Sequence, residues 1–227
     1  MKAFAYALAA AALLPWSVSA IAADGQEELT TTLETVETPE EFKMQVQNII
    51  DEVPGTGPLD EANVILDQIL NMGKKIWAVI EANKPVANVR YDYATALPKG
   101  IDSAADLEGF SPLQYRSYRL SAKNLYGMTV YDIVYTVVHR YGGNVNGKGN
   151  YLDAVTILPQ RVDVLWGYNV DFAVKRVSVA NVGSRVNPVG SLGMELSIVI
   201  KTTLQHHEQH LLYEVRGDSA KVAQVYR

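Results

Sequence analysis

The chain has 227 residues, 48% of them hydrophobic, and a formal net charge of −5. This composition predicts a folded core and argues against a disordered chain. The lack of cysteine excludes disulfides, cysteine nucleophiles, zinc–thiolate sites and iron–sulfur clusters, and the lack of a strongly basic patch argues against a nucleic-acid partner.

The N-terminus has the three parts of a secretory signal peptide. Lys2 gives a basic start, Phe4 to Leu14 is apolar, and small residues then offer cleavage positions after Ala20 and after Ala22. The apolar run is shorter than a membrane span, which needs about 20 residues. A buried N-terminal helix is the alternative, which the lack of a polar face disfavours. We therefore expect a bacterial protein that is periplasmic or secreted, with no integral membrane span after residues 1–22 are removed.

An acidic, Thr-rich segment follows over residues 23–37, and its lack of periodicity predicts a flexible leader. A helix is expected next, with Thr38 as N-cap, Pro39 at the first helical position and Glu41 completing a capping box. The proline- and glycine-rich run 54–58 should end this helix.

A second, longer helix is predicted from about Leu59 to Asn83, because apolar residues recur there at helical spacing. The two helices would form a helical pair over residues 38–84. Acidic residues predominate in 24–83, whereas 84–227 is mildly basic. The pair therefore either docks on the rest of the chain by charge or presents solvated acidic faces.

From residue 85 onward the apolar residues alternate with polar ones, which predicts strands separated by turns. Several candidate strands exceed ten residues, so bulges are expected, one of them near Lys175 and Arg176. The candidate strands are Val89–Leu97, Gln114–Leu125, Thr129–Arg140, Tyr151–Leu158, Arg161–Trp166, Asn169–Ala180, Leu192–Leu204 and Leu211–Arg216.

Two helices followed by adjacent strands predict the α+β class. We expect an N-terminal helical pair packed on an antiparallel β-sheet or sandwich of seven to eight strands. The domain organisation is then a signal peptide (1–22), a flexible acidic leader (23–37), a helical pair (38–84) and an antiparallel β domain (85–227).

The glycine-rich run 142–149 is similar to a phosphate-binding loop in the spacing of its glycines and Lys148. That loop needs Ser or Thr after the lysine and a helix beyond it, whereas here Gly149 follows and a strand is predicted. The run is therefore expected to be a glycine-rich hairpin loop.

Histidine is concentrated near the C-terminus, where His206, His207 and His210 surround Glu208. Imidazole and carboxylate groups ligate zinc and copper, so the three histidines are candidate metal ligands. In a strand, His206, Glu208 and His210 would share a face. The competing interpretation is a solvated polar turn at a hairpin tip, because both flanks are strand-like.

Aromatic residues suggest a second candidate site. The chain has 13 tyrosines, and an exposed aromatic stripe can stack on sugar rings or grip an extended peptide. Aromatic residues of strands also pack across the core of a sheet, and the pattern leaves both possibilities open. The candidate ligand-binding residues are Tyr131, Tyr135, Tyr141, Trp166 and Tyr168.

No catalytic residues and no cofactor are predicted, since neither a G-x-S-x-G elbow nor an S-x-x-K motif occurs. The sequence favours an exported, non-enzymatic binding or structural domain of the periplasm or cell envelope. Its partner would be a cell-envelope component or another protein. One alternative is a carrier that holds an apolar ligand in a helix-covered β cavity. The other is a metal-dependent enzyme that uses the cluster His206–His210.

Overall fold

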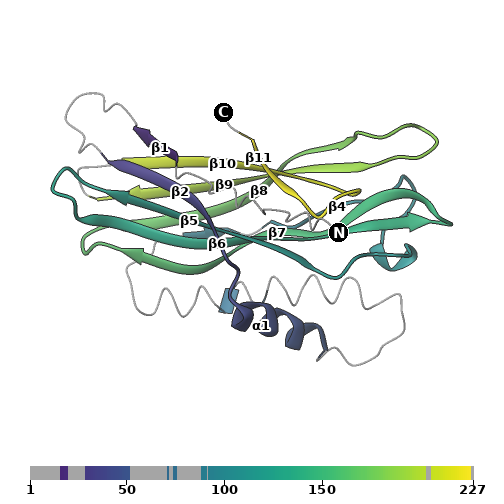
Figure 1. Ribbon diagram of the computed structural model, residues 1–227, viewed down its shortest axis with the longest axis horizontal. Helices are drawn as coiled ribbons and strands as arrows, with labels where there is room; N and C mark the ends of the chain where they lie inside the picture. The colour runs from purple at the N-terminus through teal and green to yellow at the C-terminus, as the bar shows by residue number, and fades with distance from the viewer. Residues whose placement is uncertain are drawn as a thin grey trace, which may run out of the picture.

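The computed structural model describes residues 16–19, 29–51, 71, 74–75, 88–90, 92–202 and 206–225. These residues are mostly in strands (Figure 1). The elements are β1 (Trp16–Ser19), β2 (Thr30–Val36), α1 (Glu40–Asp51), β3 (Asn88–Arg90), β4 (Ala94–Ala96), the 3-10 helix η1 (Ala104–Asp106), β5 (Gln114–Lys123), β6 (Thr129–Val145), β7 (Lys148–Val164), β8 (Asn169–Asn181), β9 (Gly190–Lys201), β10 (His206–Arg216) and β11 (Val222–Val225).

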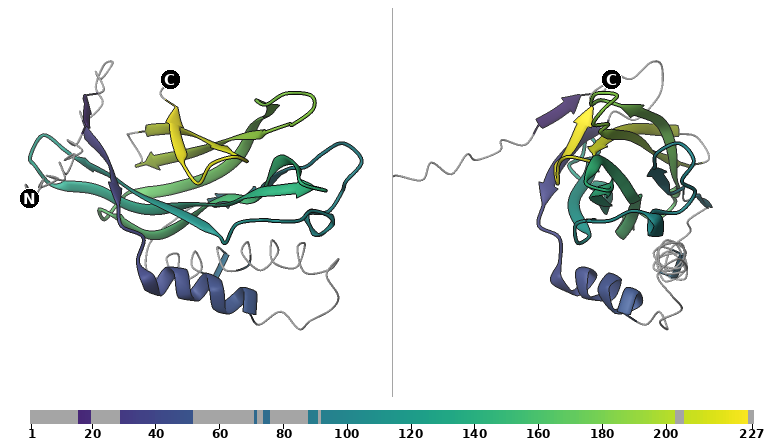
Figure 2. Two further views of the ribbon diagram at one scale, coloured as in Figure 1. Left: turned by 45° about the vertical axis from the view of Figure 1, so that its right-hand side comes forward. Right: turned by 90° about the vertical axis from the view of Figure 1, so that its right-hand side faces the viewer.

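The strands form two sheets. The six-stranded sheet has the order β1-β2-β5-β6-β7-β4, and the five-stranded sheet has the order β11-β10-β9-β8-β3. Neighbouring strands are antiparallel except for β3 and β8, which pair in parallel, so the predicted antiparallel sheet is confirmed. Figure 2 shows α1 (dark blue) on one side of the teal strands, with the yellow-green strands β9 and β10 on the other side. None of the helical segments described has the length and apolarity to span a membrane.

The expected α+β class with a helical pair is wrong. The described part of the chain is mostly β and contains one α-helix, α1, beside the two sheets. The second predicted helix, Leu59 to Asn83, lies outside the described residues except for Asn71, Lys74 and Lys75.

The N-terminal part also differs from expectation. Strand β2 lies within the segment predicted to be a flexible leader, and it pairs with β5 from Thr30 opposite Lys123 to Val36 opposite Ser117. The β-branched threonines that made the segment look like low-complexity chain suit a strand. Strand β1, which lies within the predicted signal peptide, pairs with the outer edge of β2.

The hairpin between β6 and β7 carries the glycine-rich run. Asn146 (φ 51°) and Gly147 (φ 73°) form its two-residue turn, and Asn-Gly is the pair favoured where both φ angles are positive. Strand β7 follows directly, so the expected hairpin loop is confirmed. Two predicted strands, Tyr151–Leu158 and Arg161–Trp166, merge into β7, and a bulge in the β6–β7 pairing lies beside Pro159.

The main core lies between the two sheets and is filled with large side chains. The tyrosines Tyr118, Tyr135 and Tyr213 meet at its centre, with ring centroids 4.8–6.0 Å apart. A second, smaller cluster lies on the other face of the six-stranded sheet. There Phe42 and Val46 of α1 pack on the strands, which fixes the helix over the sheet. The strand residues in contact with them are Val138, Ala154 and Leu158.

Candidate functional site

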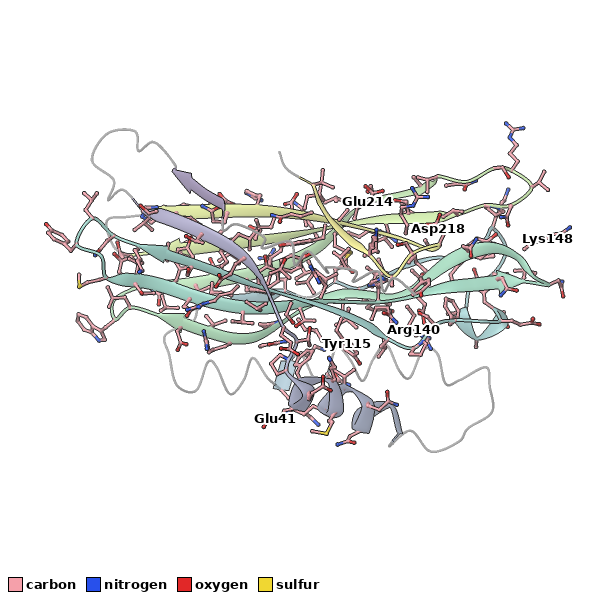
Figure 3. The ribbon with its side chains drawn as sticks, viewed as in Figure 1. Glu41, Tyr115, Arg140, Lys148, Glu214 and Asp218 are labelled. Carbon is pink, nitrogen blue, oxygen red and sulfur yellow. The ribbon has the colours of Figure 1, made fainter. Side chains whose placement is uncertain are left out.

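The candidate site is a groove of about 480 Å³ between the first turns of α1 and the outer face of the six-stranded sheet. Figure 3 labels Glu41, which belongs to the helix wall of this groove. Both polar and apolar side chains line it. They are Val36, Glu37, Pro39, Glu41, Phe42 and Gln45 on one wall, and Arg119, Val134, Gln160 and Arg161 on the sheet.

A buried hydroxyl network anchors the helix wall to the sheet. The hydroxyl of Thr38 is hydrogen-bonded to that of Ser117 (2.8 Å), which in turn bonds that of Thr136 (2.7 Å). The amide of Gln160 donates to both Ser117 and Thr136. Thr38 was expected to cap the helix, but its hydroxyl instead bonds the sheet and so attaches the start of α1 to it. The amides of Phe42 and Lys43 instead donate to the carbonyl oxygen of Pro39.

Two arginines hold the sheet wall in place through one carboxylate. Arg119 donates from Nε and Nη2 to the two oxygens of Asp132 (2.8 and 2.7 Å), and Arg161 adds a third bond (2.9 Å). The hydrogen bond from Arg119 is the largest of the effects that hold the pKa of Asp132 below its ordinary value. The shared carboxylate restrains both guanidinium groups where they line the groove. Arg119 also donates to Glu34 (3.4 Å), and Arg161 pairs with Asp163 (3.1 Å).

The charges of the groove are divided between its walls. Glu37 and Glu41 belong to the helix side, whereas Arg119 and Arg161 belong to the sheet. Val134 of β6 lies opposite Arg119 on β5 and opposite Arg161 on β7, so an apolar side chain separates the two arginines on the sheet wall. The groove can therefore take an amphipathic ligand that carries both hydrogen-bond acceptors and donors.

The structure does not gather the five candidate aromatic residues on one exposed face. Tyr131 and Tyr135 are in the core, Tyr168 is buried and Tyr141 is partly buried, whereas Trp166 is 93% exposed. The hydroxyl of Tyr135 bonds that of Tyr213, and burial is the main cause that raises the pKa of Tyr135 well above its ordinary value. These aromatics, apart from Trp166, therefore serve the packing of the sheets.

The three histidines lie in strand β10 and not in a hairpin turn. His206, Glu208 and His210 share a face, as expected for a strand, with His207 out of phase. His210 contacts Glu208 (3.0 Å) and Glu195 (3.1 Å), and Glu195 also bonds Lys175 (2.8 Å). Among the residues described, no three His, Cys, Asp or Glu side chains converge closely enough to hold a metal ion.

The structure buries two polar residues that were not among the predicted site residues. His139 is fully buried, and neither ring nitrogen makes a hydrogen bond. Burial is the main cause that lowers its pKa to about 4, and the nearby backbone of Ser219 offsets only part of that shift. Asp153, also fully buried, is bonded by Arg140, and the guanidinium of Arg140 lies over the ring of Phe110 (5.1 Å). Their positions inside strand patterns give no sign of this burial.

Comparison with family models, with curated proteins and with solved structures finds no match to this chain. Its function must therefore be argued from its own geometry.

Proposed function

We propose that this chain is an exported, non-enzymatic binding domain that holds a peptide segment of a partner protein of the cell envelope. The groove between α1 and the six-stranded sheet is the observation that carries the proposal. Its volume, about 480 Å³, is within the range of small-ligand sites, which is about 300–1,000 Å³.

A peptide suits the groove because its backbone offers both kinds of polar group at short, regular intervals. The arginines Arg119 and Arg161 can donate to peptide carbonyl oxygens or to an acidic side chain. The carboxylates of Glu37 and Glu41 can accept from peptide amides or a basic side chain. An apolar side chain of the peptide would then contact Val134.

Two other functions have less support. A carrier with its ligand between the sheets needs small inward-facing residues, but Tyr118, Tyr135 and Phe172 fill that space. A metal-dependent enzyme needs converging ligands, but His210 is engaged by Glu195 and Glu208. Arg119 and Arg161 of the groove are engaged by Asp132, which suits binding more than proton transfer.

Export is tested by the N-terminus of the protein recovered from cells. Mass spectrometry of the periplasmic and secreted fractions should find a chain that begins at Ile21 or Ala23. Recovery of the unprocessed chain from the cytoplasm would contradict export.

Peptide binding is tested by selection from a displayed peptide library with the purified chain as bait. Gln45→Trp places a large ring in the groove, whereas Asn48→Trp introduces the same ring at an exposed residue of α1 that does not line it. Selected peptides should bind the wild type and Asn48→Trp alike and lose about tenfold in affinity with Gln45→Trp. Failure to select any peptide, or equal binding by both variants, would refute the proposal.

A further inference from the structure

We propose that one end of this molecule docks on the surface of a lipid bilayer by inserting two apolar turns. The turns are residues 124–128, between β5 and β6, and residues 165–168, between β7 and β8. We call them the apolar turns. They contain none of the residues that line the groove, so this docking is independent of the proposed peptide binding.

The apolar turns expose more hydrophobic surface than a water-facing turn needs. Leu125 is 73% exposed, Tyr126 84%, Met128 50% and Trp166 93%. Scattered exposed apolar residues are normal, but a group of them on adjoining loops marks an interaction site. Here all four belong to two turns that are linked by a backbone hydrogen bond.

The join is a hydrogen bond from the amide of Leu165 to the carbonyl oxygen of Val130 (2.8 Å). Since Val130 follows the first turn and Leu165 begins the second, the turns lie side by side. Both are at the end of the molecule opposite the hairpin that carries Lys148, which Figure 3 labels at the right. The two turns are therefore exposed next to each other at one end of the molecule.

The first turn is held rigidly by Asn124. Its side-chain oxygen accepts from the amides of Tyr126 (3.1 Å) and Met128 (3.0 Å). Its carbonyl oxygen accepts from the amide of Gly127 (2.9 Å), and its own amide donates to the carbonyl oxygen of Met128 (3.0 Å). In the second turn the amide of Tyr168 donates to Leu165 (3.2 Å). These backbone groups are bonded within the protein, so placing the turns in hydrocarbon leaves them satisfied. A rigid turn also loses little conformational freedom on binding.

The charges near the turns suit a lipid surface. No residue of either apolar turn is charged, and the neighbouring Lys123 is exposed. Asp171, at the start of β8, is paired with Lys201 (2.5 Å). Tryptophan and tyrosine concentrate at the boundary between lipid headgroups and hydrocarbon. A protein partner would instead need polar contacts at the rim of the interface, and the turn amides named above are already bonded internally.

Vesicle binding tests the proposal directly. The purified chain should co-sediment with vesicles of phosphatidylethanolamine and phosphatidylglycerol, and also with vesicles of phosphatidylcholine, because insertion is chiefly apolar. Trp166→Ser should lower the partition coefficient about tenfold. The control is Val186→Ser, which removes an apolar side chain that is 79% exposed in the turn between β8 and β9. This turn lies at the other end of β8, so the control should bind as the wild type does.

Fluorescence adds a second measurement that a folding defect would not imitate. The emission of the wild-type chain should shift to the blue with vesicles, and brominated lipids should quench it. Because the chain has three tryptophans, Trp166→Phe assigns the signal, and the shift should disappear in that variant. Three results would overturn the proposal: no vesicle binding, equal binding by Trp166→Ser, or a dimer in sedimentation velocity that Trp166→Ser abolishes while vesicle binding persists. The last would show that the apolar turns dock on protein.

Discussion

The hydroxyl of Tyr135 on β6 is hydrogen-bonded to the hydroxyl of Tyr213 on β10, so one polar contact joins the two sheets inside an apolar core. Both side chains are buried. The ring of Tyr118 stacks on that of Tyr135, with centroids 5.8 Å apart and an interplanar angle of 24°. The contact therefore fixes how the two sheets lie against each other as well as adding to stability.

Tyr213→Phe should lower the free energy of unfolding by about 1–3 kcal/mol, because it leaves the buried hydroxyl of Tyr135 without its partner. The double variant Tyr135→Phe/Tyr213→Phe removes both hydroxyls and should cost less than the sum of the two single variants. Urea unfolding of the four proteins gives the coupling. Strict additivity would show that the hydrogen bond contributes nothing.

His139 should make the protein sensitive to acid. Its pKa of about 4 lies below the ordinary value of 6.5, so protonation favours the unfolded chain. The contribution of neutral His139 to the free energy of unfolding is fully present above pH 6.5 and is lost as the pH falls toward 4. At pH 5 the free energy of unfolding should be lower by about 2 kcal/mol. His139→Leu removes this titration. The free energy of unfolding of the variant minus that of the wild type should therefore be greater at pH 5 than at pH 7.5. Urea midpoints at the two pH values test this, and an unchanged difference would contradict it.

Arg140→Met should destabilise the fold strongly, because it leaves the buried carboxylate of Asp153 without its ion pair. A cost of about 3–5 kcal/mol is expected, and Arg140→Met/Asp153→Leu should recover a large part of it. Arg216→Met removes an exposed pair with Asp218 and is the control, which should unfold as the wild type does. If the double variant is no better than Arg140→Met, the unpaired carboxylate is not the cause.

Phe42→Ala should loosen α1 from the sheet, since Phe42 is 6% exposed in the cluster beneath the helix. The expected loss is about 3–5 kcal/mol, and the amides of α1 should exchange faster with deuterium. Met44→Ala is the matched control, because Met44 is 56% exposed on the same helix. Equal exchange in both variants would show that the cluster does not hold the helix.

Local chemistry was enough to predict several elements. The Thr38-Pro39-Glu41 signal correctly placed a helix, although it begins at Glu40 and Thr38 bonds the sheet. Asn146-Gly147 correctly marked the long hairpin. The bulge expected near Lys175 and Arg176 lies between Arg176 and Ser178. In each case a few neighbouring residues decide the conformation, so no knowledge of distant contacts is needed.

The site could not be predicted, because it depends on which strands meet. Alternation shows that Tyr131 and Tyr135 share a face but not whether that face is buried, and here it faces the second sheet. The groove is lined by Glu41, Arg119 and Arg161, and these residues are far apart in the sequence. Strand β2 was not predicted for the same reason. Its residues become a strand by pairing with β5, which lies much later in the sequence.

The strand order has a consequence for how the fold is reached. Strands β5, β6 and β7 pair in chain order, as do β8 to β11, so each pairing closes a short loop. Strand β2 is different, because residues 37–113 separate it from β5, and closing this longer loop costs more chain entropy. In an exported chain β2 would cross the membrane before β5 yet join the sheet only after β5 has arrived. The first described strand after the predicted signal segment would thus be among the last to join the sheet.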